Sequence, residues 1–200
     1  MKRGAGAGAP RELHRSSVQY PGGLAARYSW VGSGGAAAIF ALSEAGGRLE
    51  DLGPLVSADP DRLCRAELRV ESPLGAWTVR LASPIFDEPE GMVWDTYGLL
   101  VVKFGFRAYG LTARTGELLW AHRSSTPLIA VLGSSRLPHV ILQAEVETVA
   151  LDPDGGVAWR VAHSDVVAEA GLVGGRLVLT SYGGASQALD PQTGLPADGR

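Results

Sequence analysis

The sequence predicts an all-β fold assembled from repeated hairpins, and three observations support this. Residues 109–120 suggest a strand ending on Leu111, a polar turn with Gly116, and a second strand anchored by Trp120. The 27 glycines and 12 prolines among 200 residues suit a protein of many short strands and turns. The same phrase also returns twice, at Leu151, Gly156 and Trp159 and at Leu189 and Gly194.

The spacing of these phrases predicts a particular kind of repeat. Weaker copies lie upstream at Leu42 with Gly47 and at Val70 with Gly75. A period near 40 residues with four strand-sized pieces is typical of a β-propeller blade, whose small sheet buries its faces by stacking on its neighbours. We therefore expect about four or five blades, the first ones irregular. The apolar positions Leu42, Val70, Leu111, Leu151 and Leu189 are separated by 28, 41, 40 and 38 residues.

In chain order, residues 1–16 are small and basic, which predicts a flexible tail before a single domain over 17–196 and a polar tail over 197–200. Strands are expected over 25–31, 36–42 and 47–52, forming a first candidate blade. The segment 57–70 supports two structures. Asp59 before Pro60 suits a helix start, whereas the alternation of Cys64 to Val70 favours a strand, with one helical turn before it as an option. Its partner is expected over 77–81.

The second half is more regular. The run over 99–104 is apolar almost throughout, as expected for a strand packed on both faces. The last blade lacks a fourth strand in the sequence, so we expect either that residues 17–30 complete it or that another subunit covers it. The strands expected here are 92–94, 99–104, 107–111 and 118–122; then 127–132, 140–144, 147–151 and 157–161; then 166–172, 176–180 and 185–189.

Composition narrows the classes of function. A net charge of −3 gives no broad basic field, so nucleic acid is not expected as a partner. The single cysteine, Cys64, excludes an internal disulfide and is expected to be a buried apolar residue. The first residues do not form a convincing signal peptide, and no stretch is apolar enough for a membrane helix. A cytoplasmic location follows as the expectation.

The hairpins over 107–122 and 147–161 resemble the tryptophan-bearing repeats of the quinoprotein, or PQQ-like, β-propellers. The residues that carry this resemblance are Leu111, Thr115, Gly116, Leu119 and Trp120; Leu151, Asp152, Gly156 and Trp159; and Leu189, Asp190, Thr193 and Gly194. The resemblance covers residues 92–196 well and 36–81 faintly. It implies a scaffold or assembly role, since the quinone-binding members use paired cysteines and amide ligands, and this short chain has one cysteine and no asparagine. No cofactor is expected.

Candidate binding residues cluster around two similar tetrads, Ala-His122-Arg123-Ser and Ala-His163-Ser-Asp165, at nearly the same place in consecutive repeats. Two imidazoles with Asp165 or Asp95 would suit a divalent metal. Duplication of a loop explains the same pattern without a ligand, so His122 and His163 are weak metal candidates. Asp95 alternatively organises a turn before Gly98. No catalytic residue is indicated.

Three classes of function remain open from the sequence. The first is a non-catalytic propeller that binds another protein through its rim loops, since loops on a rigid scaffold are where recognition usually resides. The second is an enzyme or a small-molecule- or metal-binding protein that uses the central channel or the His122 and His163 rim. The third is a structural subunit, with the chain acting either as a monomer or as part of an assembly completed by a partner.

Overall fold

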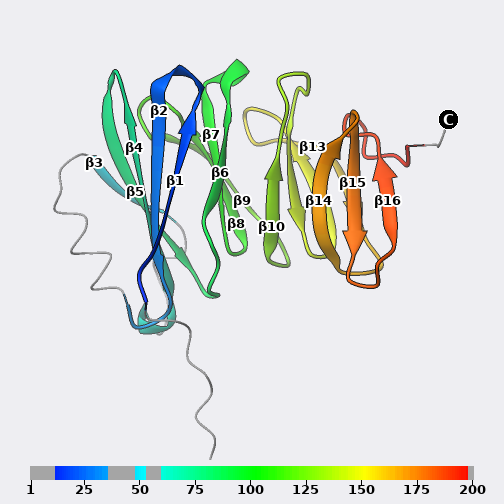
Figure 1. Ribbon diagram of the computed structural model, residues 1–200, viewed down its shortest axis with the longest axis horizontal. Helices are drawn as coiled ribbons and strands as arrows, with labels where there is room; N and C mark the ends of the chain where they lie inside the picture. Colours follow the sequence, from blue (N-terminus) through cyan, green and yellow to red (C-terminus); the bar gives the residue numbers. More distant parts are fainter. Residues whose placement is uncertain (1–11, 36–47, 53–59, 198–200) are drawn as a thin grey trace, which may run out of the picture. The chain divides into compact units, whose positions relative to one another are not determined.

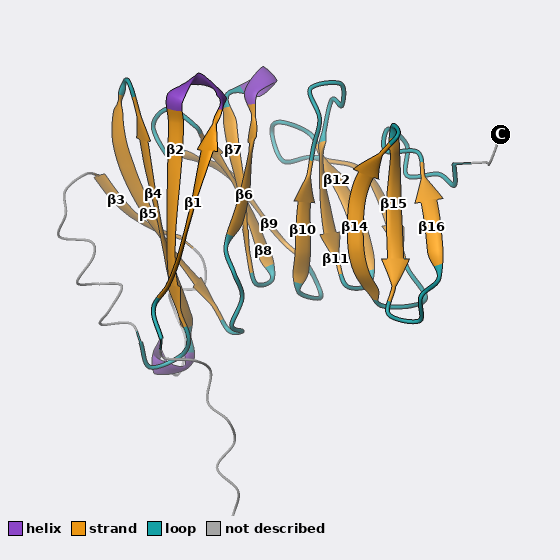
Figure 2. Ribbon diagram, viewed as in Figure 1, coloured by secondary structure: helices purple, strands orange, loops and turns teal. Residues whose placement is uncertain are grey.

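The computed structural model describes residues 12–35, 48–52 and 60–197. Apart from short 3-10 turns, the described elements are all strands (Figure 2). Contacts divide the chain into two compact units, one containing residues 1–89 and 114–116 and the other containing 90–113 and 117–200. No helix in the described part of the chain has the length and apolar character needed to cross a membrane.

The first unit contains one five-stranded sheet in the order β1-β2-β4-β5-β3 (Figure 1). The first four strands of this order are antiparallel neighbours, whereas β3 pairs with β5 in parallel. A 3-10 turn over Pro21–Gly23 joins β1 to β2, and another over Pro60–Arg62 precedes β4. The strands are β1 (His14–Tyr20), β2 (Leu24–Val31), β3 (Arg48–Leu52), β4 (Cys64–Ser72) and β5 (Gly75–Ser83).

The alternation of Cys64 to Val70 does form a strand, which confirms that interpretation over the helix. Ala66, Leu68 and Val70 have no exposed surface, while the intervening arginines alternate to the other face. On that other face, Arg69 and Arg27 of β2 both pair with the Glu71 carboxylate at 3.1 Å. Cys64 is a free, buried cysteine as expected, and burial raises the pKa of its thiol.

Two expectations for this half of the chain are wrong. The strands expected over 25–55 do not form a blade together, because β2 pairs with β4, and β3, which lies between them in the sequence, pairs with β5. Residues 17–30 do not complete the last blade, because β1 and β2 form a local hairpin in this first sheet. The strand expected over 36–42, with Leu42 and Gly47, lies outside the described residues.

The second unit contains three antiparallel sheets, each in sequence order. The first has β6 (Glu90–Trp94), β7 (Leu99–Phe104), β8 (Arg107–Thr112) and β9 (Leu118–Arg123). The second has β10 (Leu128–Leu132), β11 (Val140–Ala144), β12 (Glu147–Leu151) and β13 (Val157–Ala162). The third has β14 (Val167–Val173), β15 (Arg176–Ser181) and β16 (Ser186–Leu189). After β16, an isolated bridge joins Leu189 to Pro196. It corresponds to the pair of Leu111 with Leu118, which is the pair nearest the turn between β8 and β9.

Each neighbouring pair of these sheets encloses its own apolar core. Val101 and Trp120 of the first sheet meet Leu142 and Leu151 of the second, and the opposite face of the second sheet packs on the third (Figure 1). The cluster between the second and third sheets includes Leu137, Ile141, Ala150, Val167, Leu177, Leu179 and Leu189. Sheets repeated at this period and stacked face to face confirm the predicted all-β propeller fold.

In the second unit, a tryptophan of the first sheet packs on a turn of the second sheet, and a tryptophan of the second sheet packs on a turn that follows the third. The Trp120 indole lies against Gly155, where an added Cβ would be 2.7 Å from the ring, and its N–H donates to the Pro153 carbonyl at 3.0 Å. Trp159 lies against Gly194 in the same way. Both glycines have positive φ, 85° and 70°, a conformation that side chains disfavour.

The glycine that meets the indole is therefore Gly155 rather than the expected Gly156. The turn there is one residue shorter than its relatives, since the Asp152 N–H bonds the Gly156 carbonyl while the Asp190 N–H bonds the Leu195 carbonyl. In the first unit, Gly116 faces Trp77 in the same manner. Gly75, expected to be the turn glycine of an earlier repeat, instead lies in β5 with nothing within 4 Å of an added Cβ.

This packing predicts a graded effect of two glycine substitutions. Gly184→Ala places a Cβ in open space at φ 81°, so we expect it to lower the free energy of unfolding by about 1–2 kcal/mol through backbone strain alone. Gly155→Ala adds a clash with Trp120 at φ 85°, for a further loss of about 1–3 kcal/mol. Urea unfolding of both variants measures the difference, and equal losses would contradict the docking role.

Candidate functional site

The register of the sheets shows that His122 and His163 do not occupy equivalent positions. Ser124 and His163 both donate a backbone N–H to the carbonyl that precedes a third strand, at Phe106 and Val146 respectively. His122 lies two residues earlier, inside β9, where it pairs with Ala108. The similar tetrads of the sequence are thus two residues out of phase along their hairpins.

The two histidines lie on opposite faces of the β10–β13 sheet. His122 shares its face with Ala108, which packs toward the β10–β13 sheet. His163 bonds Thr148, which is on the other face of that sheet, toward β14–β16. A sheet therefore separates the two imidazoles. No group of three or more histidine, cysteine or acidic side chains is placed to hold a metal ion in the described ranges.

His163 belongs to a chain of polar side chains at one end of the second unit. Its Nε2 lies 2.7 Å from the Thr148 hydroxyl, which donates to Oε1 of the Gln143 side chain at 2.6 Å. The Thr148 proton is thus used, so Nε2 carries the proton and donates to Thr148. Nδ1 then accepts from the Gln187 amide at 3.5 Å. Burial lowers the pKa of His163, consistent with a neutral ring whose two nitrogens both have partners.

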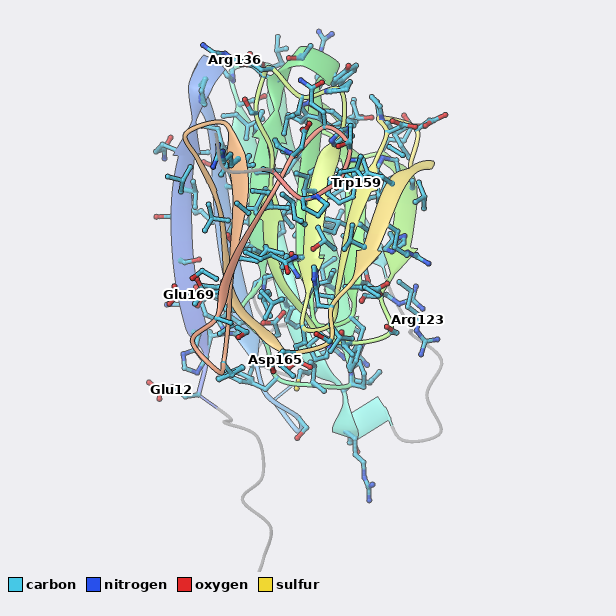
Figure 3. The ribbon with its side chains drawn as sticks, turned by 90° about the vertical axis from the view of Figure 1, so that its right-hand side faces the viewer. Glu12, Arg123, Arg136, Trp159, Asp165 and Glu169 are labelled. Atoms are coloured by element: carbon cyan, nitrogen blue, oxygen red, sulfur yellow. The ribbon has the colours of Figure 1, made fainter. Side chains whose placement is uncertain are left out.

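Asp165 lies at the exposed edge of the same end (Figure 3). The Ser181 hydroxyl and the backbone N–H groups of Val166 and Gly183 lower the pKa of its carboxyl. The bond from the Val166 N–H is 2.8 Å long. The lowered pKa keeps the carboxylate ionised at neutral pH. The Tyr182 N–H, which donates to the Val166 carbonyl at 2.9 Å, holds the β13–β14 connection against the β15–β16 turn.

A cavity of about 260 Å³ opens beside these groups. Val167 and Leu179, both buried, form its apolar part, and the His163 ring and the Gln187 amide are among its polar walls. Beside it, Tyr182 is 78% exposed on the β15–β16 turn, where its N–H bonds the Val166 carbonyl. We call this region, comprising residues 163–165 and 181–187, the Asp165 surface.

A second polar cluster surrounds Glu147 on the other side of the β10–β13 sheet. One of its carboxylate oxygens accepts from the Ser124 hydroxyl at 2.9 Å and from the N–H and hydroxyl of Ser125. The other oxygen lies 3.5 Å from the Arg160 Nε. These partners, Ser124 first, outweigh the effect of burial and lower the pKa of Glu147. Burial and then Arg160 lower the pKa of His122, which stays neutral there.

The remaining candidates lie apart from this network. Asp95 begins a 3-10 turn, Asp95–Tyr97, at one end of the β6–β9 sheet, where Trp94 pairs with Leu99. His122 pairs with Ala108 near the opposite end of that sheet. Asp95 therefore cannot join His122 in one site. Its backbone carbonyl accepts the Gly98 N–H, which fits the turn interpretation. Arg123 is exposed at the end of β9 (Figure 3).

Two prominent residues were absent from the sequence-based candidates. Tyr182 carries only the weak signal of an aromatic in a Ser-Tyr-Gly-Gly turn. His139 is 2% exposed, and its Nε2 lies 2.6 Å from the Pro191 carbonyl oxygen and 3.2 Å from the Trp159 indole nitrogen. The shorter contact requires the proton on Nε2, because two lone pairs would repel at that distance. In the preceding repeat, the Trp120 indole N–H donates to the Pro153 carbonyl. Here the His139 ring bonds the corresponding carbonyl, that of Pro191.

No protein-family model matches the chain, and no curated protein matches it. Several solved structures are similar. Dihydro-heme d1 dehydrogenase NirN matches with a TM-score of 0.53 and 14% identity over 74% of this chain and 36% of its own. BamB from Moraxella catarrhalis matches with a TM-score of 0.43 and 23% identity over 52% and 34%. The Neurospora crassa Pan2 WD40 domain matches with 0.47 and 14% over 68% and 45%.

The chain thus spans less than half the length of these three structures. At such identities the likeness to NirN concerns the fold alone, and it agrees with the propeller blades described above. The resemblance to the PQQ-like repeats stays an expectation, since it rests on the sequence phrases and the tryptophan packing.

The half-buried side chains of His122 and His163 predict a pH-dependent stability. The folded state holds the pKa of His163 and His122 below the ordinary value of 6.5, so the unfolded chain binds more protons between the folded and unfolded pKa values. We expect the free energy of unfolding to fall as the pH falls below about 6.5. Urea unfolding at pH values from 7.5 to 5.5 measures this change in the free energy of unfolding. These pH values lie above the ordinary pKa of aspartate and glutamate side chains, roughly 4.

His163→Gln should reduce the slope of stability against pH, whereas Ser164→Ala at the adjacent exposed position should preserve it. An unchanged slope in the His163 variant would show that this ring is not held neutral by the fold.

Proposed function

We propose that the protein is a non-catalytic propeller that binds another protein through the Asp165 surface. The observation that carries the proposal is Tyr182, which is 78% exposed beside an ionised carboxylate and a small cavity. An aromatic ring costs free energy when it is exposed to water. Tyrosine is also enriched among the residues that dominate protein–protein affinity, since it adds a large contact area and a hydroxyl at little entropic cost.

The segments that carry Tyr182 and Asp165 are joined before any partner arrives. The β15–β16 turn bonds back to the β13–β14 connection through the Tyr182 N–H, which donates to the Val166 carbonyl at 2.9 Å. His163, Thr148 and Gln187 bond one another behind this turn. Binding would therefore cost little ordering of the backbone, which favours affinity.

The charge of the Asp165 surface favours a basic partner. Asp165 and Glu169 are both exposed, and Figure 3 places both labelled residues toward the same part of the unit. From residue 161 to 199 the sequence has one lysine or arginine, Arg176, and it lies at the far end of β15 from Ser181. We infer a partner segment with a lysine or arginine for Asp165 and an apolar group for Tyr182.

The hydrogen bonds of His163 argue against catalysis by this ring. A general base needs a free lone pair within reach of a substrate proton. Here Nε2 donates to Thr148, and Nδ1 accepts from Gln187. The separation of His122 from His163 by a sheet likewise removes the geometric support for a metal-dependent enzyme at this rim.

The proposal predicts that replacing the Tyr182 side chain abolishes or strongly reduces binding of the partner. The tagged protein is used to capture proteins from its native cell extract, with mass-spectrometric quantification against Tyr182→Ser and Asp165→Asn. We expect one partner at near-stoichiometric amount, reduced at least about tenfold by Tyr182→Ser, with Asp165→Asn weakening capture more at low salt than at high salt.

Leu74→Ser is the matched control, because Leu74 is an apolar residue 70% exposed on the β4–β5 turn. Urea unfolding checks that each variant stays folded. Equal capture of the partner by wild type and by Tyr182→Ser would contradict the proposal. Self-association detected by light scattering, with no other partner captured, would favour the structural-subunit alternative instead.

A further inference from the structure

The opposite end of the second unit holds a larger cavity, of about 350 Å³. It is lined by the β10–β11 connection, the β14–β15 turn and the turn after β16. Figure 3 shows Arg136, at its edge, far from Asp165 in the view. Ligand pockets usually have volumes of about 300–1,000 Å³, so this cavity is large enough for one or two side chains. Its lining residues are Ser134, Arg136, Leu137, Leu172, Gly175, Asp190, Pro191 and Gln192.

The lining combines an apolar floor with a cationic edge. Leu137 and Pro191 are buried and Leu172 is half-buried, whereas Arg136 is exposed. Among the residues that the structure describes, no carboxylate lies within 4.0 Å of the Arg136 guanidinium. A guanidinium beside apolar surface is suited to a carboxylate next to an apolar group.

The one acidic side chain in the wall is already engaged. An Asp190 carboxylate oxygen accepts the Gln192 N–H at 2.8 Å, and the Asp190 carbonyl accepts the Gly194 N–H at 2.8 Å. Asp190 therefore caps its own turn. The Arg136 guanidinium is therefore the charge in the wall that remains available to an anion.

The walls are held in place by the interactions that join the second and third sheets. The His139 ring bonds the Pro191 carbonyl, and Gly194 packs against Trp159. On the opposite wall, the Ser134 hydroxyl accepts the Arg136 N–H at 3.3 Å, and the Ser134 carbonyl accepts the Leu137 N–H at 3.0 Å. This turn places the Arg136 backbone at the edge of the cavity. The cavity is thus formed without a ligand, which lowers the cost of binding.

We propose that this cavity binds a peptide segment of a partner protein in which a carboxylate neighbours an apolar side chain. Arg136 pairs with the carboxylate, and Leu137, Leu172 and Pro191 receive the apolar group. The carboxylate can be an acidic side chain or a chain terminus, since both present the same two oxygens. This site is separate from the Asp165 surface, so the two proposals stand or fall independently.

The test is an NMR titration of the ¹⁵N-labelled full chain with three short peptides. The first is acetyl-Ala-Leu-Glu-Ala-amide, with an internal carboxylate, and the second is acetyl-Ala-Ala-Leu with a free C-terminal carboxylate. The third, acetyl-Ala-Leu-Gln-Ala-amide, lacks the charge. We expect saturable shifts of the amides of residues 134–137, 172–175 and 190–194 with one or both acidic peptides, and at least about tenfold weaker binding of the uncharged one.

Charge variants sharpen the test. Arg136→Gln should weaken the acidic peptide about tenfold or more, and Gln192→Glu at the exposed wall should weaken it while Gln192→Lys strengthens it. Arg15→Gln, at an exposed position of β1, should change nothing.

Stronger binding of the first or the second peptide identifies the source of the carboxylate. The proposal is overturned if neither acidic peptide shifts these amides at up to about 10 mM, or if the uncharged peptide or the Arg136 variant binds equally well. Tyr182→Ser should leave this titration unchanged, which separates it from the proposed function.

Discussion

The packing of an indole ring against the turn of the following sheet is the interaction on which the second unit depends. A small sheet with two apolar faces is stable only when both are covered. Trp120 and Trp159 reach across to Gly155 and Gly194, and the lack of a Cβ allows the ring to lie on the turn backbone. Trp120 also donates its indole N–H to the Pro153 carbonyl, so this donor is paired. The contact therefore fixes the register between neighbouring sheets.

The sequence repeats predicted most of this unit because its contacts are local. Each strand pairs with the next along the chain, so a leucine, a turn glycine and a tryptophan at fixed offsets specify one hairpin. The first unit could not be predicted in this way. Its β2 pairs with β4 across an insertion of 32 residues, 32–63, and no local pattern states which of two distant strands will be neighbours. The tryptophan in its fourth antiparallel strand, Trp77, was a better marker of the repeat than Val70 and Gly75.

The different positions of His122 and His163 could not be predicted from the sequence for a related reason. Side chains alternate between the faces of a sheet, so position along a strand decides what a residue can touch. His122 and His163 looked equivalent because each follows an alanine, yet only the pairing partners, Ala108 for the first and the Val146 carbonyl for the second, reveal their different places. The candidates Asp165, in the β13–β14 connection, and Arg123, the last residue of β9, are both exposed. The exposure of Tyr182 and the burial of His139 depend on packing that sequence patterns do not report.

The repeat also explains why ligand-sized cavities form where they do. Sheets of regular strands pack closely in their middle, where apolar side chains of the second and third sheets meet. At the ends the connections differ in length and polarity, so packing loosens and polar side chains reach solvent. Asp165 lies at one end, with Arg123 of a neighbouring sheet toward the same end, whereas Arg136 and Asp190 line the cavity at the other. A scaffold whose core is set by tryptophan and glycine leaves its end connections free to differ in length and charge.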